Sequence, residues 1–262
     1  MTPTSNDTLA RHKLFISLLI GSLAALLWFA PGQWLALAVQ HLTHEQVQLR
    51  QVRGTVWDGS AQWVLAAGAG GREALALPQR VHWRLRPNWD ASLQIELQVD
   101  CCTSQALLMQ LKPDWQGLHI TLNNIDSVWP AQWLSGLGAP WNSMNLQGRL
   151  ALNSQQLQWH TSNGNWRLSG AATLELRQLS SSLSTLKPLG TYVVQLQGGP
   201  TPTLQLRTSE GKLQLQGSGS WQAGHFRFQG EAWAMLGYEN ALNNLLGVLG
   251  QRTGDKTILR LG

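Results

Sequence analysis

The chain has 262 residues, of which 43% are hydrophobic and only 13% are charged, whereas an average soluble domain carries roughly 25% charged residues. This composition excludes an intrinsically disordered chain, which combines low hydrophobicity with high net charge, and the two cysteines exclude a disulfide-built miniprotein or a multi-cysteine zinc array. The net charge of +5 comes from scarce acidic residues (14 Asp and Glu), and the 19 Lys and Arg residues are spread along the chain, which disfavours nucleic-acid binding.

The first predicted element is an apolar helix near the N-terminus. Residues 14–43 contain no Asp, Glu, Lys or Arg, and the most apolar part, residues 14–30, is close to the length of about 20 residues that a helix needs to cross a bilayer. The apolar sequence continues after Pro31. Arg11 and Lys13 precede it, and this positive flank predicts that the N-terminus stays in the cytoplasm.

These features predict three parts of the chain: a cytoplasmic tail over residues 1–13, a single transmembrane anchor over residues 14–39, and a domain outside the cytoplasm over residues 40–262. A cleaved signal peptide is the alternative, with Ala36-Leu37-Ala38 as a small-x-small cleavage site. We favour the uncleaved anchor because this site lies well beyond the apolar core and follows a proline. A buried core helix is a third option, which the basic flank and the charge-free run disfavour.

After Glu45 the sequence alternates between apolar and polar residues. Leu93–Val99 (LQIELQV) keeps a strict period of two, which is typical of a strand with one buried and one solvated face. Similar stretches lie at residues 47–57, 62–65, 81–85, 118–122, 146–152, 166–176, 192–197, 203–207, 212–216, 225–229 and 257–261. Short spacers such as Asn163-Gly164 and Glu210-Gly211 favour hairpins. We therefore predict an all-β domain, a curved antiparallel meander of half-barrel or sandwich-like form.

One or two short helices interrupt the predicted strands. Residues 127–138 (SVWPAQWLSGLG) begin with Ser127 as a helix N-cap and carry Pro130 in the first turn, where proline is tolerated. Residues 235–249 place one methionine and five leucines at helical spacing, which predicts a lid packed on the sheet, with partner binding as the alternative. Residues 180–184 and 198–200 are expected to be loops.

The sequence offers little that resembles a catalytic or metal site. His41 and His44 are three residues apart and can share a helical face as weak metal ligands, but no acidic or cysteine ligand follows at a useful spacing. Four other histidines occupy strand-like positions, where an exposed or interfacial side chain is the ordinary explanation: His82, His119, His160 and His225. No carboxylate pair, phosphate-binding glycine loop or nucleophile elbow stands out, so we expect no enzyme, no cofactor and no metal.

Cys101 and Cys102 are adjacent in the sequence. Outside the cytoplasm they can form a vicinal disulfide or an intermolecular one, although the vicinal bond is geometrically strained. The alternative is two small residues that end the preceding strand. A redox catalyst is disfavoured because it would need a spaced pair at the start of a helix.

The most distinctive string is GTVWDGSA at residues 54–61, which is expected to end a strand in a turn at Asp58-Gly59. It follows the predicted anchor and a short strand, and this order resembles the protein N family of the bacterial type II secretion system, in which a Gly-Thr-x-Trp-x-Gly-x-Ala string follows the anchor. Residues 137–141 (LGAPW), 146–150 (LQGRL) and 247–261 are also similar to the family. The resemblance implies structural or docking roles, and no catalytic ones, for Gly54, Thr55, Trp57, Gly59, Ala61, Pro140, Trp141, Gly148 and Arg149.

The resemblance implies a bitopic inner-membrane protein of a Gram-negative bacterium with a periplasmic β domain and an accessory role in exporting folded proteins. Its implied partners are other inner-membrane and periplasmic components of that machinery. The alternative is a periplasmic lipid-binding or lipid-shuttling protein that uses an apolar groove in the curved sheet, a fold analogy with outer-membrane assembly factors. An enzyme is the least favoured hypothesis.

Overall fold

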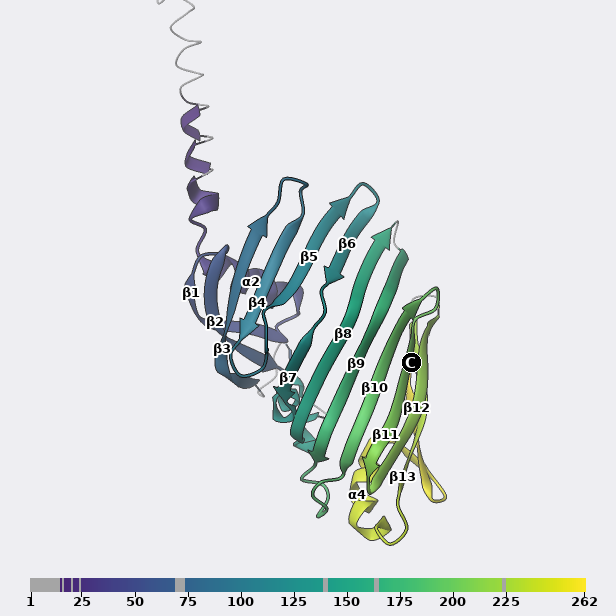
Figure 1. Cartoon of the computed structure of the whole chain (residues 1–262). Coiled ribbons are helices and arrows are strands. Elements are labelled where there is room, and N and C mark those ends of the chain that lie inside the picture. The colour runs from purple at the N-terminus through teal and green to yellow at the C-terminus, as the bar shows by residue number, and fades with distance from the viewer. Residues whose placement is uncertain are drawn as a thin grey trace, which may run out of the picture.

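The described part of the chain is dominated by one antiparallel sheet (Figure 1). The computed structural model describes residues 15–262 except 16, 20, 24, 69–73, 139–140, 163–164 and 223–224. Within these ranges the sheet has 15 strands, and its order is β1-β2-β3-β4-β5-β6-β8-β9-β10-β11-β12-β13-β15-β14, with β7 paired to β8. Most strands therefore pair with their neighbours in sequence, which confirms the predicted meander.

The strands are β1 (Val47–Gly54), β2 (Asp58–Ala66), β3 (Ala74–Pro87), β4 (Leu93–Val99), β5 (Leu107–Asp114), β6 (Gly117–Leu122), β7 (Asp126–Pro130), β8 (Gln147–Ser162), β9 (Asn165–Ser180), β10 (Gly190–Gly199), β11 (Thr203–Gly211), β12 (Leu213–Gln222), β13 (His225–Ala234), β14 (Gln251–Thr253) and β15 (Lys256–Leu261). The helices are α2 (Gly32–Leu42), the 3₁₀ helix η1 (Ala131–Leu137), α3 (Trp141–Met144) and α4 (Glu239–Leu249). The described residues between Phe15 and Trp28 are also helical.

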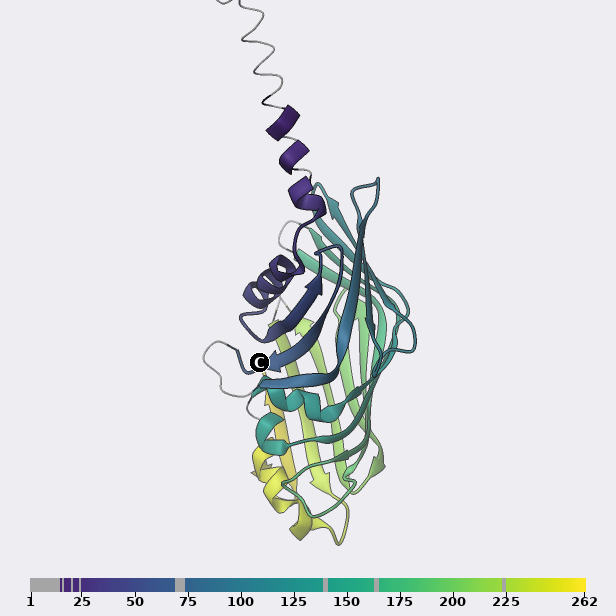
Figure 2. The ribbon, with the colours of Figure 1, turned by 90° about the vertical axis from the view of Figure 1, so that its left-hand side faces the viewer.

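The sheet is strongly curved, and α2, η1 and α4 lie on the side toward which it curls (Figure 2). The alternation of the strands explains this arrangement, because every second side chain points to that side. There the core forms two clusters. The first joins Leu242 and Leu245 of α4 to Tyr192 and Leu213 of the sheet. The second contains buried residues of β2, β3 and β4, against which Leu35 and Trp133 of the two other helices pack: Ala61, Leu77, Val81, Trp83 and Val99, together with Cys102.

The helix predicted for residues 127–138 is wrong in its first part. Residues 126–130 form β7, in which Val128 pairs with Ala151 of β8, and only Ala131–Leu137 is helical. Ser127 caps no helix, and its hydroxyl instead accepts a hydrogen bond from the indole of Trp129. The β-branched and aromatic residues before Pro130 favour extended backbone, and pairing with β8 outweighs the capping signal.

Other differences concern the ends of elements. The predicted helix at residues 235–249 begins only at Glu239, because Gly237 has a positive φ of 86° in the turn before it. The predicted strand at residues 47–57 ends at Gly54, and the expected loops at residues 180–184 and 198–200 are partly strand, since β9 reaches Ser180 and β10 reaches Gly199. Strands β5, β7 and β14 were not predicted.

The apolar N-terminal region consists of two helices that meet near Pro31. The first includes Trp28, and α2 begins at Gly32 and packs Leu35 against the second core cluster. The break falls just before Pro31, because a proline disfavours helical backbone in the residue before it. Over the described residues, none of the helices has the length and apolarity needed to span a bilayer.

Candidate functional site

The string at residues 54–61 forms the turn between β1 and β2. Gly54 has a φ of +88°, and a Cβ there would lie 2.5 Å from the carbonyl oxygen of Asp58. The amide of Thr55 donates to that same carbonyl at 2.8 Å, and the amide of Asp58 donates to the Thr55 hydroxyl at 3.1 Å. Glycine and threonine are therefore required by the geometry of a tight turn.

This turn holds the end of the N-terminal helix. The indole Nε1 of Trp57 donates to the carbonyl oxygen of Leu27 at 2.8 Å, and the amide of Val56 donates to that of Ala30 at 2.9 Å. The Leu27 carbonyl also accepts from the Ala30 amide at 3.4 Å, so the indole is a second donor at the end of the helix, and the Val56 amide satisfies a carbonyl just beyond it. Ala30 is buried at the contact. The turn thereby fixes the direction in which the helix leaves the sheet.

A buried tryptophan of β3 packs against the turn and donates a hydrogen bond to it. Trp83 lies opposite Gly59 in the β2–β3 ladder, and its Nε1 donates to the carbonyl of Val56 at 3.0 Å. A Cβ at Gly59 would lie 2.5 Å from the Trp83 ring and 2.6 Å from the Arg53 carbonyl oxygen, so only glycine leaves room for the ring. Ala61 is completely buried beside them. The motif residues are thus brought together as one structural unit.

Replacing Trp57 by phenylalanine is expected to loosen this junction. The variant keeps an aromatic ring but loses the donor to Leu27, a contribution of about 1 kcal/mol for one hydrogen bond. Hydrogen–deuterium exchange over residues 25–31 should become faster. Trp115→Phe, at a fully exposed position, is the matched control and should leave the exchange unchanged. Equal exchange in the two variants would contradict the assigned role of the indole.

The second family string lies in α3 and β8. Gly148 has a φ of +133°, and a Cβ there would lie 2.8 Å from the carbonyl oxygen of Arg177, so it forms an irregular position in the β8–β9 ladder. Arg149 and Trp141 are exposed, and Pro140 lies outside the described residues. No contact described for these residues joins them to the turn at residues 54–61, so the two strings serve separate parts of the sheet.

Two further glycines contribute to the junction and were not singled out in the sequence. A Cβ at Gly32 would lie 2.9 Å from Val52 of β1, and a Cβ at Gly136 would lie 2.5 Å from the carbonyl of Leu65 in β2. These glycines let α2 and η1 lie directly against the sheet. The Pro31-Gly32 pair is recognisable in the sequence as a helix break. Nothing in the sequence marks Gly136 except its place near the end of the helix predicted for residues 127–138.

The junction adjoins a cluster of three tryptophans. Trp63 of β2 makes edge-to-face contacts with Trp129 of β7 and Trp133 of η1, at ring-centroid distances of 6.0 and 5.0 Å. Trp129 and Trp133 stack at 5.4 Å. These rings fasten β7 and η1 to the first strands, so part of the high tryptophan content serves core packing.

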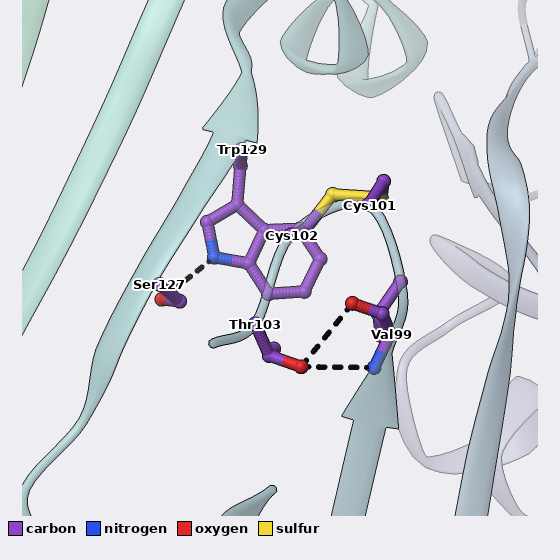
Figure 3. The surroundings of a disulfide bond; sticks show 6 residues. All are labelled: Val99, Cys101, Cys102, Thr103, Ser127 and Trp129. Carbon is purple, nitrogen blue, oxygen red and sulfur yellow. Dashed lines mark hydrogen bonds between the residues drawn. A yellow bond between two sulfur atoms is a disulfide. The ribbon is translucent and has the colours of Figure 1, made fainter. Parts of the chain in front are cut away.

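Cys101 and Cys102 form a disulfide in the turn that follows β4 (Figure 3). Cys102 is buried, and its carbonyl accepts a hydrogen bond from the amide of Val128 at 2.7 Å. The Thr103 hydroxyl accepts from the Val99 amide at 3.1 Å and so closes the same turn. The pair therefore lies where β4 meets β7, next to Trp129.

The histidines lie apart from this junction. His119 of β6 and His160 of β8 are paired on adjacent strands, with ring centroids 3.8 Å apart, and a carboxylate oxygen of Asp114 lies 3.7 Å from His119 Nε2. His82 and His225 are exposed strand residues, as expected, and His41 and His44 lie at the end of α2. Within the described ranges, no group of three or more His, Cys, Asp or Glu side chains is arranged to hold a metal ion.

The carboxylate with the clearest perturbation belongs to the turn between β3 and β4. Asp90 accepts hydrogen bonds from the hydroxyl and amide of Ser92 and from Lys112, which lower its pKa from 3.8 to about 2. Because its folded-state pKa is depressed, the ionised carboxylate stabilises the turn above about pH 4, and this stabilisation is lost as the pH falls toward 2. The shift arises in an exposed ion pair and indicates local structure rather than catalysis.

Titration of the Asp90 carboxyl by NMR should therefore give a midpoint near pH 2. In Lys112→Gln, which keeps the Ser92 contacts, the midpoint should move upward toward the ordinary aspartate value. An unchanged midpoint would show that the lysine does not act on the carboxylate.

Comparison with known proteins identifies one family. The family described as "Type II secretion system (T2SS), protein N" matches residues 45–258, which include the junction turn and almost the whole sheet. No curated protein and no solved structure matches the chain. The match confirms the resemblance seen in the strings at residues 54–61 and 137–150. The chain belongs to the protein N family of the type II secretion system.

Proposed function

We propose that this chain is a non-enzymatic accessory subunit of the type II secretion machinery, held in the inner membrane by its N-terminal helix and acting through protein contacts in the periplasm. Family membership supports a part in type II secretion and contacts with other components of that system. The observation that carries the finer proposal is the junction at residues 54–61, which binds an apolar helix to the sheet in a defined direction.

The helix before the junction has the surface of a membrane-embedded segment. Its aromatic and aliphatic side chains are largely exposed: Phe15, Leu18, Leu19, Leu23, Leu26, Leu27, Trp28 and Phe29. An exposed apolar surface of this size is unfavourable in water and favourable in lipid. With Arg11 and Lys13 before it, the helix would keep the N-terminus cytoplasmic and the sheet periplasmic.

The chemistry of the described residues supports a contact protein. The groups with displaced pKa values are separate from one another: Asp90 and Arg84 belong to exposed ion pairs, and the pKa of Tyr192 is raised by burial in the core. Tyr192 donates its hydroxyl to the carbonyl of Leu213, which is a structural bond. None of these groups forms a nucleophile with a base beside it.

The two edges of the sheet offer backbone for such contacts. The edge strands are β1 and β14, and a strand at an edge presents unpaired amide and carbonyl groups to a partner strand. Strand β14 is only three residues long. Strand β1, which comes after α2, is therefore the longer edge on which a partner strand could pair. The partners would be inner-membrane or periplasmic components of the same machinery.

Complementation of a deletion strain tests this function. Wild-type protein should restore secretion of folded exoproteins and should co-purify with other secretion components, whereas Trp57→Ala should reduce both. Leu236→Ala, which changes an exposed apolar residue in the turn before α4, tests whether the loss is specific to the junction. Unchanged secretion in the deletion strain, with no co-purification, would rule out the proposal.

A second candidate function is lipid binding in the hollow of the sheet. Two rows of partly exposed apolar residues, paired from strand to strand, run from β3 to β8 on the same face as Trp83. One row contains Leu85, Ile95, Met109, Leu122 and Leu157, and the other contains Pro87, Leu93, Leu111, Ile120 and Trp159. An apolar lining that side chains do not fill is the feature that an acyl chain requires.

Native mass spectrometry of the full chain after removal of detergent distinguishes this candidate. A bound phospholipid is expected, and Leu93→Glu should lose it, whereas Gln94→Glu, one residue along on the opposite face, should retain it. A stable chain without lipid would exclude this function.

A further inference from the structure

We infer that the tips of the β3–β4 and β5–β6 hairpins rest on the membrane surface, with Trp89 and Trp115 inserted at the lipid–water interface. This inference rests on the proposed anchoring of the N-terminal helix and adds a second contact between the chain and the bilayer. The partner is the surface of the same membrane that the helix enters.

The first observation is where tryptophan occurs. Trp57, Trp89 and Trp115 stand in the turns that follow β1, β3 and β5. Because adjacent strands run in opposite directions, these three turns lie at one end of the sheet. Trp57 holds the N-terminal helix at that end. Trp89 and Trp115 are fully exposed, at 107% and 102% of their reference areas.

The second observation is direction. Both tips point toward the end of the molecule from which the N-terminal helix projects, and they reach the level of its last turns in both views (Figures 1 and 2). The contacts of Trp57 and Val56 with the helix fix this relation. A bilayer that encloses the helix would therefore have its interface at the height of the two tips.

The third observation is that the β3–β4 tip is an ordered turn. Ser92 is buried, its carbonyl accepts from the Asn88 amide at 2.8 Å, and its hydroxyl donates to Asp90 at 2.6 Å. Lys112 of the next hairpin pairs with Asp90 at 3.1 Å. The polar side chains of the turn thus bond to one another and leave Trp89 projecting alone.

The chemistry of the tips favours an uncharged interface. Lys112 pairs with Asp90, so the charges of the first tip balance, and Asp114 beside Trp115 adds a negative charge, which anionic lipid does not attract. Tryptophan prefers the headgroup level of a membrane because its ring is apolar and its indole N–H is polar. We therefore expect contact with zwitterionic lipid, without a requirement for anionic lipid.

Site-specific fluorescence of the full chain in nanodiscs tests the inference. A polarity-sensitive probe is attached to Trp89→Cys, Trp115→Cys, Leu23→Cys in the helix, and Leu236→Cys. Leu236 is an equally exposed apolar residue, at 94%, in the turn before α4 at the opposite end of the sheet (Figure 1). The wild-type chain, whose two cysteines are bonded to each other, should take up no probe.

In phosphatidylcholine nanodiscs, probes at 89 and 115 should shift to shorter emission wavelength and lose intensity when the lipid headgroups carry nitroxide. The probe at 236 should do neither, and the probe at 23 should be quenched by nitroxide deep in the acyl chains. If the probes at positions 89 and 115 behave like the probe at 236 while the probe at 23 lies in the acyl chains, the proposed membrane anchoring is supported and this inference is overturned. If 23 also lies in water, the proposed anchoring fails, and this inference fails with it. Quenching at 89 and 115 that appears only with anionic lipid would contradict the interfacial role of the tryptophans.

Discussion

Gly59→Ala is expected to destabilise the domain by about 1–3 kcal/mol and to reduce secretion in the complemented deletion strain. The added Cβ would lie 2.5 Å from the Trp83 ring and 2.6 Å from a backbone carbonyl, and neither group can move freely. Trp83 is buried in the second core cluster and also donates to the turn that holds the helix. The substitution should therefore lower the urea midpoint of the full chain in detergent and speed hydrogen exchange over residues 25–31.

Gly247→Ala is the matched control. Gly247 lies in α4 with no heavy atom within 4 Å of an added Cβ, and replacing a helical glycine with alanine stabilises by up to about 1 kcal/mol. The same chemical change is thus expected to have opposite signs at the two positions. A neutral Gly59→Ala variant with normal secretion would mean that the contact between Trp83 and the turn does not support the junction.

Leu242→Ala is expected to cost about 2–5 kcal/mol of unfolding free energy. Leu242 is completely buried between α4 and the sheet, in one cluster with Tyr192 and Leu213. Removing its side chain leaves a cavity between α4 and the sheet that the neighbouring side chains cannot readily fill. The measurement is urea unfolding followed by tryptophan fluorescence.

Val248→Ala in the same helix is the control, because it changes helix propensity without removing a fully buried side chain. Val248 is half exposed, so its truncation should change stability by no more than about 0.5 kcal/mol. If the two variants unfolded at the same urea concentration, α4 would not be packed on the sheet as described.

The regular part of the fold was predictable because its signal is local. In β4, the alternation of Leu93, Ile95 and Leu97 with polar residues required one buried face, and the hairpin spacers required antiparallel neighbours. Strands β5 and β7 lacked this regular signal, since β5 ends in Lys-Pro-Asp and β7 contains Ser127 and Pro130, which resemble the start of a helix. Their conformation depends on pairing with β6 and β8, which a single sequence does not display.

The junction could be located from the sequence but not explained by it. The string at residues 54–61 was visible, but the turn predicted at Asp58-Gly59 is wrong in position: these two residues begin β2, and the chain turns at residues 55–57. The contact from Trp57 to Leu27 spans 30 residues, and the space that Gly59 leaves for Trp83 spans 24. Such contacts depend on where the sheet places β3, so the role of each motif residue emerges only from the assembled structure.

The order of strands in the sheet bears on how the chain can fold as it is synthesised. From β1 to β6 and from β8 to β13, each strand pairs with the strand that was synthesised immediately before it. A strand that emerges during synthesis therefore finds its partner already in place. The short sequence separation between partners lowers the entropy cost of each pairing step. The sheet can thus grow outward from the helix junction, one hairpin after another, until α4, β14 and β15 complete its far end.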